Sequence, residues 1–501
     1  MAKFARSITS GQHGKFAHGR GGSPLLGRGV AQCKCSRNRQ FSQFALDAIA
    51  IFVSHHCAGQ RKRINFAYYD FGAFRALSAF SDFSIVSAFP ALFAPTQLSS
   101  PTSHLVARNA KRAKWSMAQL ETLGLRPPLD NLAMPTINSD IHWMTLALTW
   151  AEKAMYITTP NPRVGCVLVN AQGELLGAGH TQPAGQAHAE IMALQDAKNQ
   201  GHVVTGATAY VTLEPCSHQG RTGPCCDALL DDGLARVVVA VQDPNPQVSG
   251  NGLARLRQAG IHVDVGVLED KARALNQGFF KRMTQGAPWM RLKLAASLDG
   301  QTALTNGVSQ WITSAAARQD GHAWRARACA VLTGIGTVLE DNPQLNVRDV
   351  DTPRQPTLVI VDSKLETPLN ARLWQTQREV WIYCAAENME RKAALQAKGA
   401  HVMCLPNAQG KVDLRAMHQD LGQRAINEVH IEAGYKLNGS LLSAQVVDEL
   451  LVYLAPLLIG QGLGMANLGP FETLTQALKL DIQNITTIGE DIRLMALTKR
   501  G

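Results

Sequence analysis

Three candidate zinc ligands stand at fixed points along one stretch of the chain, and no other feature constrains the fold as tightly. The stretch His188–Cys225 reads HAEIMALQDAKNQGHVVTGATAYVTLEPCSHQGRTGPC. A catalytic zinc site takes three protein ligands from His, Cys, Asp or Glu and keeps a fourth position for water. His188, Cys216 and Cys225 supply three such ligands, so the fold must bring them together. Glu190, on the first turn of a predicted helix, is placed to move protons at that water without ligating the metal.

Residues of these types often have no such role. On that interpretation His188 is a surface histidine, Glu190 is solvated and the cysteines are small buried apolar groups. The order of elements favours the metal site, because HxE opens a helix, a strand follows, and Cys225 opens a second helix whose dipole favours a thiolate. HxE followed by PCxxC is the signature of zinc nucleobase deaminases. Here eight residues, SHQGRTGP, separate Cys216 from Cys225, and spacing alone does not choose between Cys225 and Cys226.

The region around this motif alternates between strand and helix patterns. Apolar residues recur at helical spacing from Ile141 to Ala151, with Ser139 or Asp140 as a candidate N-cap. Short apolar strands are predicted at VGCVLV, ATAYVTL and RVVVAV, with helices near 189–198 and 226–232. This alternation predicts a layered α/β domain over residues 134–284.

The second half repeats the alternation after a polar, turn-rich segment, 281–288. A strand, WMRLKLAASL, follows this segment. The later runs TLVIVD, EVWIYC, HVMCL, EVHIEAG and ELLVYLAPLLIG are rich in Val, Ile and Leu. Continuous apolar runs of this kind favour a largely parallel, buried sheet. We therefore expect a second α/β domain over residues 285–501.

Residues 1–133 do not match the rest of the chain. Residues 1–115 carry 16 Lys and Arg against three Asp, and twelve of the fifteen Phe lie before residue 94. The longest apolar run, FALDAIAIFV, is about half the length that spans a bilayer. An Arg- and Ser-rich, acid-poor N-terminus also fits an organelle transit peptide. We favour a poorly structured, dispensable extension that is either disordered or not part of the native enzyme.

The body of the chain is close to neutral. Residues 116–501 hold 33 basic against 36 acidic residues. A nucleic-acid groove needs clustered positive charge, so small molecules are the expected partners, with neither nucleic acid nor membrane. The ten scattered cysteines indicate reduced thiols or metal ligands rather than a disulfide framework. A cytoplasmic location is therefore expected, with organelle import through the extension as the alternative.

Glycines in the second half give only weak evidence of a nucleotide site. Gly334 and Gly336 follow a predicted strand, but Leu339 stands where a third fingerprint glycine would be. Gly434 and Gly439 lie near a helix start, where pyrophosphate can bind.

Several motifs together carry a specific resemblance. HTQPAGQAHAE, TLEPCSHQGRTGPCC and QDPNPQVSGNG occur in one order, followed by KLAASLDGQTA, SQWITS, VLTGIGTVLEDNPQLNVR and IEAG. From about Asp140 to the C-terminus the chain resembles the bifunctional riboflavin-biosynthesis deaminase/reductases. The resemblance implies a cytidine-deaminase-like three-layer α/β/α domain followed by a dihydrofolate-reductase-like α/β domain. It also implies Zn²⁺ and NADPH as cofactors.

The resemblance also implies the reactions. The first domain would remove the 2-amino group of 2,5-diamino-6-(5-phosphoribosylamino)pyrimidin-4-one. The second would reduce the ribosyl unit to give 5-amino-6-(5-phosphoribitylamino)uracil.

Site residues follow from the same motif matches. His188, Cys216 and Cys225 would be zinc ligands and Glu190 the proton shuttle. Asn161, His180 and Arg221 would contact the pyrimidine and its ribose phosphate, although Asn161 between two prolines could merely shape a turn. The candidates for NADP binding are Ala295, Trp311, Thr337, Asp341, Ser363, Gly434, Tyr435, Lys436, Leu437, Asn438, Gly439 and Ser440. The candidates for binding the substrate of the reductase are Ser309, Arg325, Leu345, Arg348 and Glu432, with Lys293 as a further one.

Two other functions fit parts of the sequence. One is a deaminase whose reductase domain is degenerate, which an assay of NADPH oxidation would distinguish. The other is a nucleic-acid-editing deaminase, which needs a basic surface near His188 and conflicts with the neutral body. For the bifunctional enzyme we expect a homo-oligomer.

Overall fold

The computed structural model describes residues 136–218, 223–246 and 248–499. The described residues all belong to one compact unit of the chain. The predictions made for residues 1–133 lie outside the described residues.

The first half of the described chain forms a five-stranded sheet in the order β2-β1-β3-β4-β5. Strand β1 is antiparallel to both β2 and β3, whereas β3, β4 and β5 are parallel. The strands are β1 (Gly165–Val169), β2 (Leu175–His180), β3 (Thr208–Val211), β4 (Arg236–Val239) and β5 (His262–Val265). Three of them, β1, β3 and β4, are the strands predicted from apolar runs.

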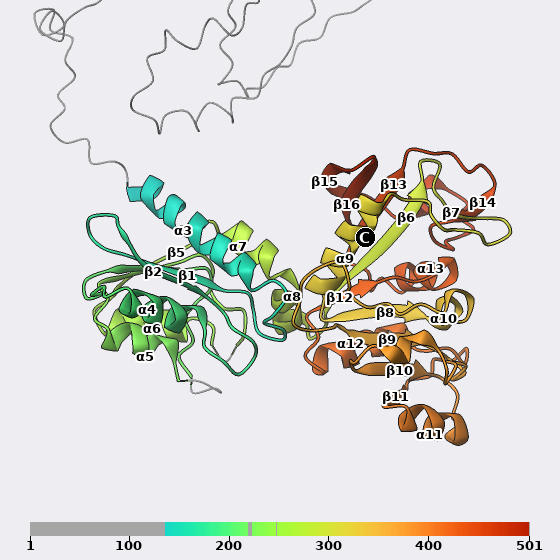
Figure 1. The fold of residues 1–501 in the computed structure, drawn as a ribbon, viewed down its shortest axis with the longest axis horizontal. Coiled ribbons are helices and arrows are strands. Elements are labelled where there is room, and N and C mark those ends of the chain that lie inside the picture. The colour runs from blue at the N-terminus through green and yellow to red at the C-terminus, as the bar shows by residue number, and fades with distance from the viewer. Residues whose placement is uncertain (1–135, 219–222, 247, 500–501) are drawn as a thin grey trace, which may run out of the picture. The chain divides into compact units, whose positions relative to one another are not determined.

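Helices cover both faces of this sheet (Figure 1). Helices α3 (Thr136–Lys153) and α7 (Glu269–Leu275) lie on one face. Helices α4 (Ala189–Asn199), α5 (Cys225–Asp231) and α6 (Asn251–Gln258) lie on the other. The predicted three-layer α/β/α arrangement is therefore confirmed.

The predicted start of the first helix is wrong. Helix α3 begins at Thr136, so Asp140 lies inside it and does not cap it. The Asp140 carboxylate instead accepts hydrogen bonds from Tyr210 Oη at 2.8 Å and from Arg236 Nη1 at 2.9 Å. These long-range partners account for a buried acid in a helix, and local helix-start rules do not detect them.

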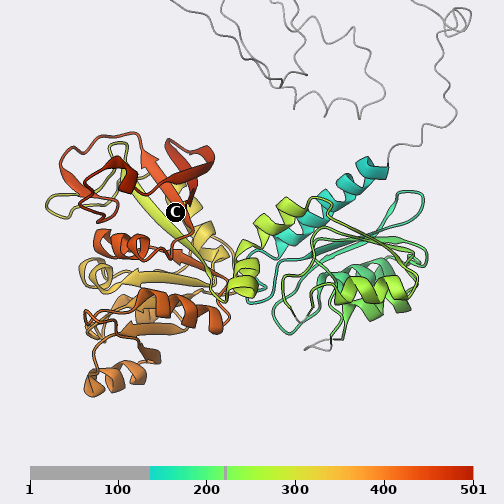
Figure 2. The same ribbon diagram turned by 180° about the vertical axis from the view of Figure 1, so that it is seen from behind.

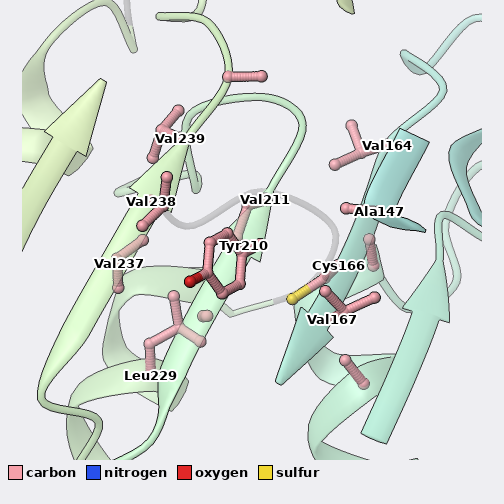
Figure 3. Close-up of a cluster of buried hydrophobic side chains, with 14 of the residues drawn as sticks. Ala147, Val164, Cys166, Val167, Tyr210, Val211, Leu229, Val237, Val238 and Val239 are labelled. Carbon is pink, nitrogen blue, oxygen red and sulfur yellow. The ribbon is translucent and has the colours of Figure 1, made fainter. Parts of the chain in front are cut away.

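The core of this half consists mainly of aliphatic side chains, together with the aromatic residues Tyr210, Phe279 and Phe280. Figure 3 shows Val167, Val211 and Val238 on three neighbouring strands, with Tyr210 beside them. All four residues are buried. Continuous burial along the strands is the consequence of helices on both faces.

The second half forms a nine-stranded sheet in the order β11-β10-β9-β8-β12-β6-β13-β16-β15. All neighbouring pairs from β11 to β13 are parallel, and β16 and β15 add antiparallel strands. Figures 1 and 2 show from opposite sides that β11 and β15 lie at the two ends of the sheet. The largely parallel, buried sheet predicted from the apolar runs is confirmed.

The elements of this half are the following. The helices are α9 (Ala315–Arg327), α10 (Ile335–Asp341), α11 (Met389–Ala397), α12 (Leu414–Gln423) and α13 (Tyr435–Ser443), with 3₁₀ turns η3 (Arg372–Gln375) and η4 (Leu474–Gln476). Helix α8 (Gln277–Gln285) precedes this half. The strands of the large sheet are β6 (Trp289–Ser297), β8 (Ala330–Gly334), β9 (Thr357–Val361), β10 (Val380–Cys384), β11 (Ala400–Cys404), β12 (Glu428–Ile431), β13 (Glu449–Ala455), β15 (Leu480–Ile488) and β16 (Asp491–Thr498). Strands β7 (Gln301–Leu304) and β14 (Gly462–Gly464) form a separate antiparallel pair.

No helix within the described residues is long and apolar enough to cross a membrane.

The close approach of α3 to β1 generates a stability prediction. A Cβ added at Gly165 would lie 1.9 Å from the carbonyl oxygen of Ala147 and 2.6 Å from the amide nitrogen of Ala151. Both atoms belong to the α3 backbone and cannot move independently, so Gly165→Ala should destabilise this half by about 1–3 kcal/mol. Calorimetric unfolding should show the loss as a lower transition temperature.

Gly321→Ala provides the matched control, since a Cβ there meets no atom within 4 Å and the residue lies inside α9. This change should be neutral or should stabilise by up to about 1 kcal/mol. A transition temperature of Gly165→Ala equal to that of the parent chain would contradict the packing described.

Candidate zinc centre and reductase site

The three predicted zinc ligands come from three separate elements. His188 is the N-cap of α4, with extended backbone and no side-chain capping bond. Cys216 lies in the segment after β3, and Cys225 is the first residue of α5. Because two helix starts face the loop that follows β3, three residues distant in sequence meet at one point.

The distances between the ligand atoms fit a zinc ion. Nδ1 of His188 lies 3.6 Å from Sγ of Cys216 and 3.3 Å from Sγ of Cys225. The three ligand atoms all lie within 4.8 Å of one another. Tetrahedral zinc with ordinary Zn–S and Zn–N bond lengths separates a sulfur from a nitrogen by about 3.5 Å. The donor set therefore matches the metal in chemistry and in spacing.

The two thiols are strongly coupled. A hydrogen bond from the Cys225 side chain lowers the pKa of Cys216 to about 4, and the amide of Cys225 also donates to that sulfur at 3.3 Å. The Cys216 sulfur, together with burial, raises the pKa of Cys225. A divalent cation between the two sulfurs would remove this conflict, because a zinc-bound thiol is deprotonated.

Glu190 lies next to the cluster and is only 3% exposed. Burial, followed by the negative charge of Cys216, raises the pKa of Glu190 to about 7. A carboxyl group with a pKa near neutrality can both take up and release a proton during turnover.

The side chain of Cys226 points away from the cluster. Its thiol donates to the carbonyl oxygens of Pro215 at 3.3 Å and Gly252 at 3.7 Å. Cys225 therefore faces His188, whereas Cys226 does not.

Glu214, which the sequence analysis did not single out, organises the loop around Cys216. Its carboxylate accepts hydrogen bonds from the backbone amides of Asp243, Gly250, Gly252 and Leu253, at 2.9–3.3 Å. These bonds hold the segment after β4 and the start of α6 against the TLEPC segment. The sequence feature that could have identified Glu214 is its position directly before Pro215 and Cys216.

The candidate pyrimidine contacts gather at the same edge of the sheet. Gly165, at the start of β1, pairs with His180 at the end of β2, and Asn161 lies four residues before Gly165. The His180 ring lies 6.0 Å from the ring of Trp150, and burial lowers its pKa. Arg221 lies outside the described residues.

The candidate NADP contacts lie at the carboxyl ends of the strands of the large sheet. Helix α10 follows β8 directly, and Gly434, after β12, is the N-cap of α13. Strands β8 and β12 are neighbours, and a Cβ at Gly434 would lie 3.8 Å from Oγ1 of Thr337. Two helix N-termini thus meet beside adjacent strands, an arrangement suited to pyrophosphate.

The remaining NADP candidates lie on several elements of the reductase half. Ser363 follows β9, Asp341 ends α10 and Ala295 lies in β6. Trp311 is 67% exposed, with the Arg318 guanidinium carbon 4.5 Å from its ring centroid. Tyr435, Lys436, Leu437, Asn438, Gly439 and Ser440 form the first turns of α13.

Arg325 and Glu432 form a bidentate pair. Nε and Nη2 of Arg325 donate to the two carboxylate oxygens of Glu432 at 2.7 and 2.9 Å. Burial opposes ionisation of Glu432, but the charges and hydrogen bonds of Arg325 and His430 together outweigh burial and hold the pKa of Glu432 well below the ordinary value. Nη1 of Arg325 donates to the carbonyl of Asn346. All three nitrogens of the Arg325 guanidinium therefore donate hydrogen bonds within the protein.

The other candidates for the reductase substrate lie on several segments, and Arg348 and Lys293 are the ones connected to this pair. Arg348 is exposed, and its Nη1 donates to the Asn346 side chain at 3.2 Å. Leu345 is buried in the same loop, whereas Ser309 lies in the loop before α9. Burial lowers the pKa of Lys293, and its charge interacts with Glu432.

Two family models match the two halves separately. The model for the zinc-binding region of cytidine and deoxycytidylate deaminases matches residues 137–241, and the model for the RibD C-terminal domain matches residues 288–494. The fold and the two matches define a bifunctional enzyme, in which a zinc-dependent deaminase domain and a reductase domain share one chain.

Relatives cover both halves at once. The riboflavin biosynthesis protein RibD of Escherichia coli is 44% identical over 368 residues, covering 71% of this chain and 98% of that protein. RibD of Aquifex aeolicus is 42% identical over 353 residues, covering 70% of this chain and 97% of that protein. The chain belongs to the RibD family of riboflavin-biosynthesis enzymes, and its cofactors are Zn²⁺ and NADPH.

Solved structures of related proteins also match most of this chain. RibD of Acinetobacter baumannii is 42% identical with a TM-score of 0.66, covering 73% of this chain and all of that one. A diaminohydroxyphosphoribosylaminopyrimidine deaminase/5-amino-6-(5-phosphoribosylamino)uracil reductase of Thermotoga maritima is 31% identical with a TM-score of 0.65 and the same coverage.

The contrast between Cys225 and Cys226 provides a test of the metal centre. Cys225→Ser should lose most of the bound zinc, because one of three protein ligands becomes a poor donor. Cys226→Ser should keep about one zinc per chain, because its thiol contacts only backbone carbonyls. Metal analysis of the purified proteins measures both. Zinc loss from Cys226→Ser with retention in Cys225→Ser would contradict the geometry.

Proposed function

We propose that the zinc centre deaminates 2,5-diamino-6-(5-phosphoribosylamino)pyrimidin-4-one. We further propose that the second half reduces the ribosyl side chain of the product with NADPH, giving 5-amino-6-(5-phosphoribitylamino)uracil. The observation that carries the proposal is the convergence of His188, Cys216 and Cys225 beside the buried carboxyl group of Glu190. The name of the Thermotoga maritima protein, which includes both activities, supports the choice of substrate.

Within the deaminase site we assign the metal to His188, Cys216 and Cys225. When bound there, zinc would lower the pKa of a water molecule towards neutrality. Glu190 takes a proton from the water that attacks the ring carbon and delivers it to the amino nitrogen, so that ammonia leaves. The raised pKa of Glu190 supports both transfers.

Substrate binding in this half is assigned to three polar residues. Asn161 and His180 lie at one edge of the sheet and would contact the pyrimidine. Arg221, in the insert between the two cysteines, would contact the ribose phosphate. This assignment gives the insert SHQGRTGP a role in substrate specificity.

In the reductase half we assign the nicotinamide nucleotide to the edge formed by α10 and α13. NADPH supplies the hydride, so the protein's contribution is mainly to orient the reactants. Arg325 already donates two hydrogen bonds to the carboxylate of Glu432, so we propose that it orients Glu432. We assign the phosphate of the substrate to Arg348, whose side chain is exposed. Ser309, Leu345 and Lys293 complete the proposed substrate site.

We propose that the two domains divide between α8 and β6. Helix α8 ends at Gln285 and β6 begins at Trp289, and the second family model begins at residue 288. The proposed domains are 134–284 and 285–501.

We propose a cytoplasmic homo-oligomer. A cytoplasmic location is supported by the seven cysteines among the described residues, which are all free thiols. The oligomer is supported by the edge strand β15, where Ile482 and Ile485 are 57% and 61% exposed.

Replacing the carboxyl group of Glu190 by an amide tests proton transfer separately from metal binding. Glu190→Gln should keep its zinc but lose deamination by about a hundredfold or more, because the amide cannot shuttle a proton. Ammonia release from the diaminopyrimidine substrate measures this loss. Reduction of the deaminated substrate by the same protein should remain within about twofold of the parent, because the second half does not contain Glu190.

The matched control is Glu174→Gln, an exposed glutamate before β2 that contacts only Asn170. It should leave both activities unchanged. Near-normal ammonia release from Glu190→Gln would exclude the proposed role.

A further inference from the structure

The segment that carries Asn161 is held by residues of the reductase half. Its Thr159 hydroxyl lies 2.8 Å from Sγ of Cys329, which precedes β8. The carbonyl oxygen of the next residue, Pro160, accepts a hydrogen bond of 2.8 Å from Nδ2 of Asn427, which precedes β12. Both residues directly before Asn161 are therefore fixed from outside the deaminase sheet.

The other end of the segment is held by a buried ion pair. Nη1 of Arg163 donates to Oε1 of Glu428 at 2.6 Å, and Nη2 donates to the carbonyl of Arg327 at 3.0 Å. Arg163 and Glu428 are 7% and 1% exposed. Glu428 also pairs with Arg291 and Arg327, so the segment is attached to a buried cluster of charges that is costly to disrupt.

The Asn427 side chain has one defined orientation. Its Oδ1 accepts a hydrogen bond of 2.5 Å from Nε of Arg282, on α8. Since a guanidinium can only donate, the amide oxygen must face Arg282 and the amide nitrogen must face Pro160. Asn427 thus presents a fixed donor to the deaminase segment.

Asn161 itself depends on these neighbours. Its backbone nitrogen donates to the carbonyl of Thr158 at 2.8 Å. Among the residues that the structure describes, no side chain bonds the Asn161 amide, and the residue is only half-buried. Its position is therefore set through the backbone, from Pro160 on one side and Arg163 on the other.

We propose that Asn427 is a positioning residue for the deaminase substrate: by holding the Pro160 carbonyl it places Asn161 against the pyrimidine, so that the reductase half completes the deaminase site. The inference rests on the proposed function, in which Asn161 contacts the substrate. Asn427 does not touch the reacting atoms, and its effect is on binding rather than on proton transfer.

The test uses the full chain and the isosteric change Asn427→Asp, which keeps an acceptor for Arg282 and removes the donor to Pro160. We expect the KM of deamination to rise roughly five- to tenfold, as for the loss of one hydrogen bond, with kcat within about twofold. Zinc content and reduction of the deaminated substrate should be unchanged. If Asn427→Asp does not fold, Asn427→Ala, which adds no charge, takes its place.

Asn407→Asp is the matched control. The Asn407 side chain accepts from the amides of Gln409 and Lys411 in a turn of the reductase half, and an aspartate can do the same. This variant should keep the KM of the parent chain.

A double variant separates the inference from the proposed function. If Asn427 acts through Asn161, Asn427→Asp should raise KM by less than about twofold in an Asn161→Ala background. A raised KM for Asn161→Ala with a normal KM for Asn427→Asp would overturn the inference alone. The inference alone would also be overturned if Asn427→Asp raised the KM of deamination in the Asn161→Ala background as much as it does in the parent chain. A normal KM for Asn161→Ala would overturn the Asn161 contact and the inference with it.

Discussion

The antiparallel placement of β1 between β2 and β3 is the constraint on which the deaminase site depends. Because β1 runs against both neighbours, its start lies beside the ends of β2 and β3. The segment with Asn161 enters at that edge, His180 ends β2 there, and β3 leads from there to Cys216. The helix that begins after His188 closes the cluster. A change of register by one residue would turn these side chains to the opposite face.

Strand β12 links the two halves of the protein by the charges on one of its faces. Glu428 and Glu432 point to the same side, since side chains alternate along a strand. At the start of the strand Glu428 binds Arg163 of the deaminase half, and at its end Glu432 binds Arg325 in the reductase site. Glu428 is buried and Glu432 is partly buried, and neighbouring guanidinium groups help to hold the pKa of both carboxyl groups well below the ordinary value. One short strand therefore supports two sites with different chemistry.

Sequence predicted the features that depend on short stretches of chain. His188 and Cys225 were recognisable because each stands at the start of a helix, and the parallel sheet was recognisable from its apolar runs. Features that depend on distant partners were not accessible. The four backbone amides that donate to the Glu214 carboxylate belong to residues 29–39 positions further along the chain. The guanidinium of Arg325 donates to Glu432, which is 107 positions away. The three-dimensional structure was also needed to show that the side chain of Cys225, and not that of Cys226, faces His188.

The central claim is that two chemically distinct sites act in sequence on one substrate. The most direct measurement is to supply purified enzyme with the diaminopyrimidine phosphoribosyl substrate, with and without NADPH, and to identify the products by mass. The account predicts only the deaminated ribosyl product without NADPH and the ribityl product with it. Accumulation of the deaminated ribosyl product in the presence of NADPH, with no ribityl product, would contradict the claim and identify the second half as a degenerate reductase.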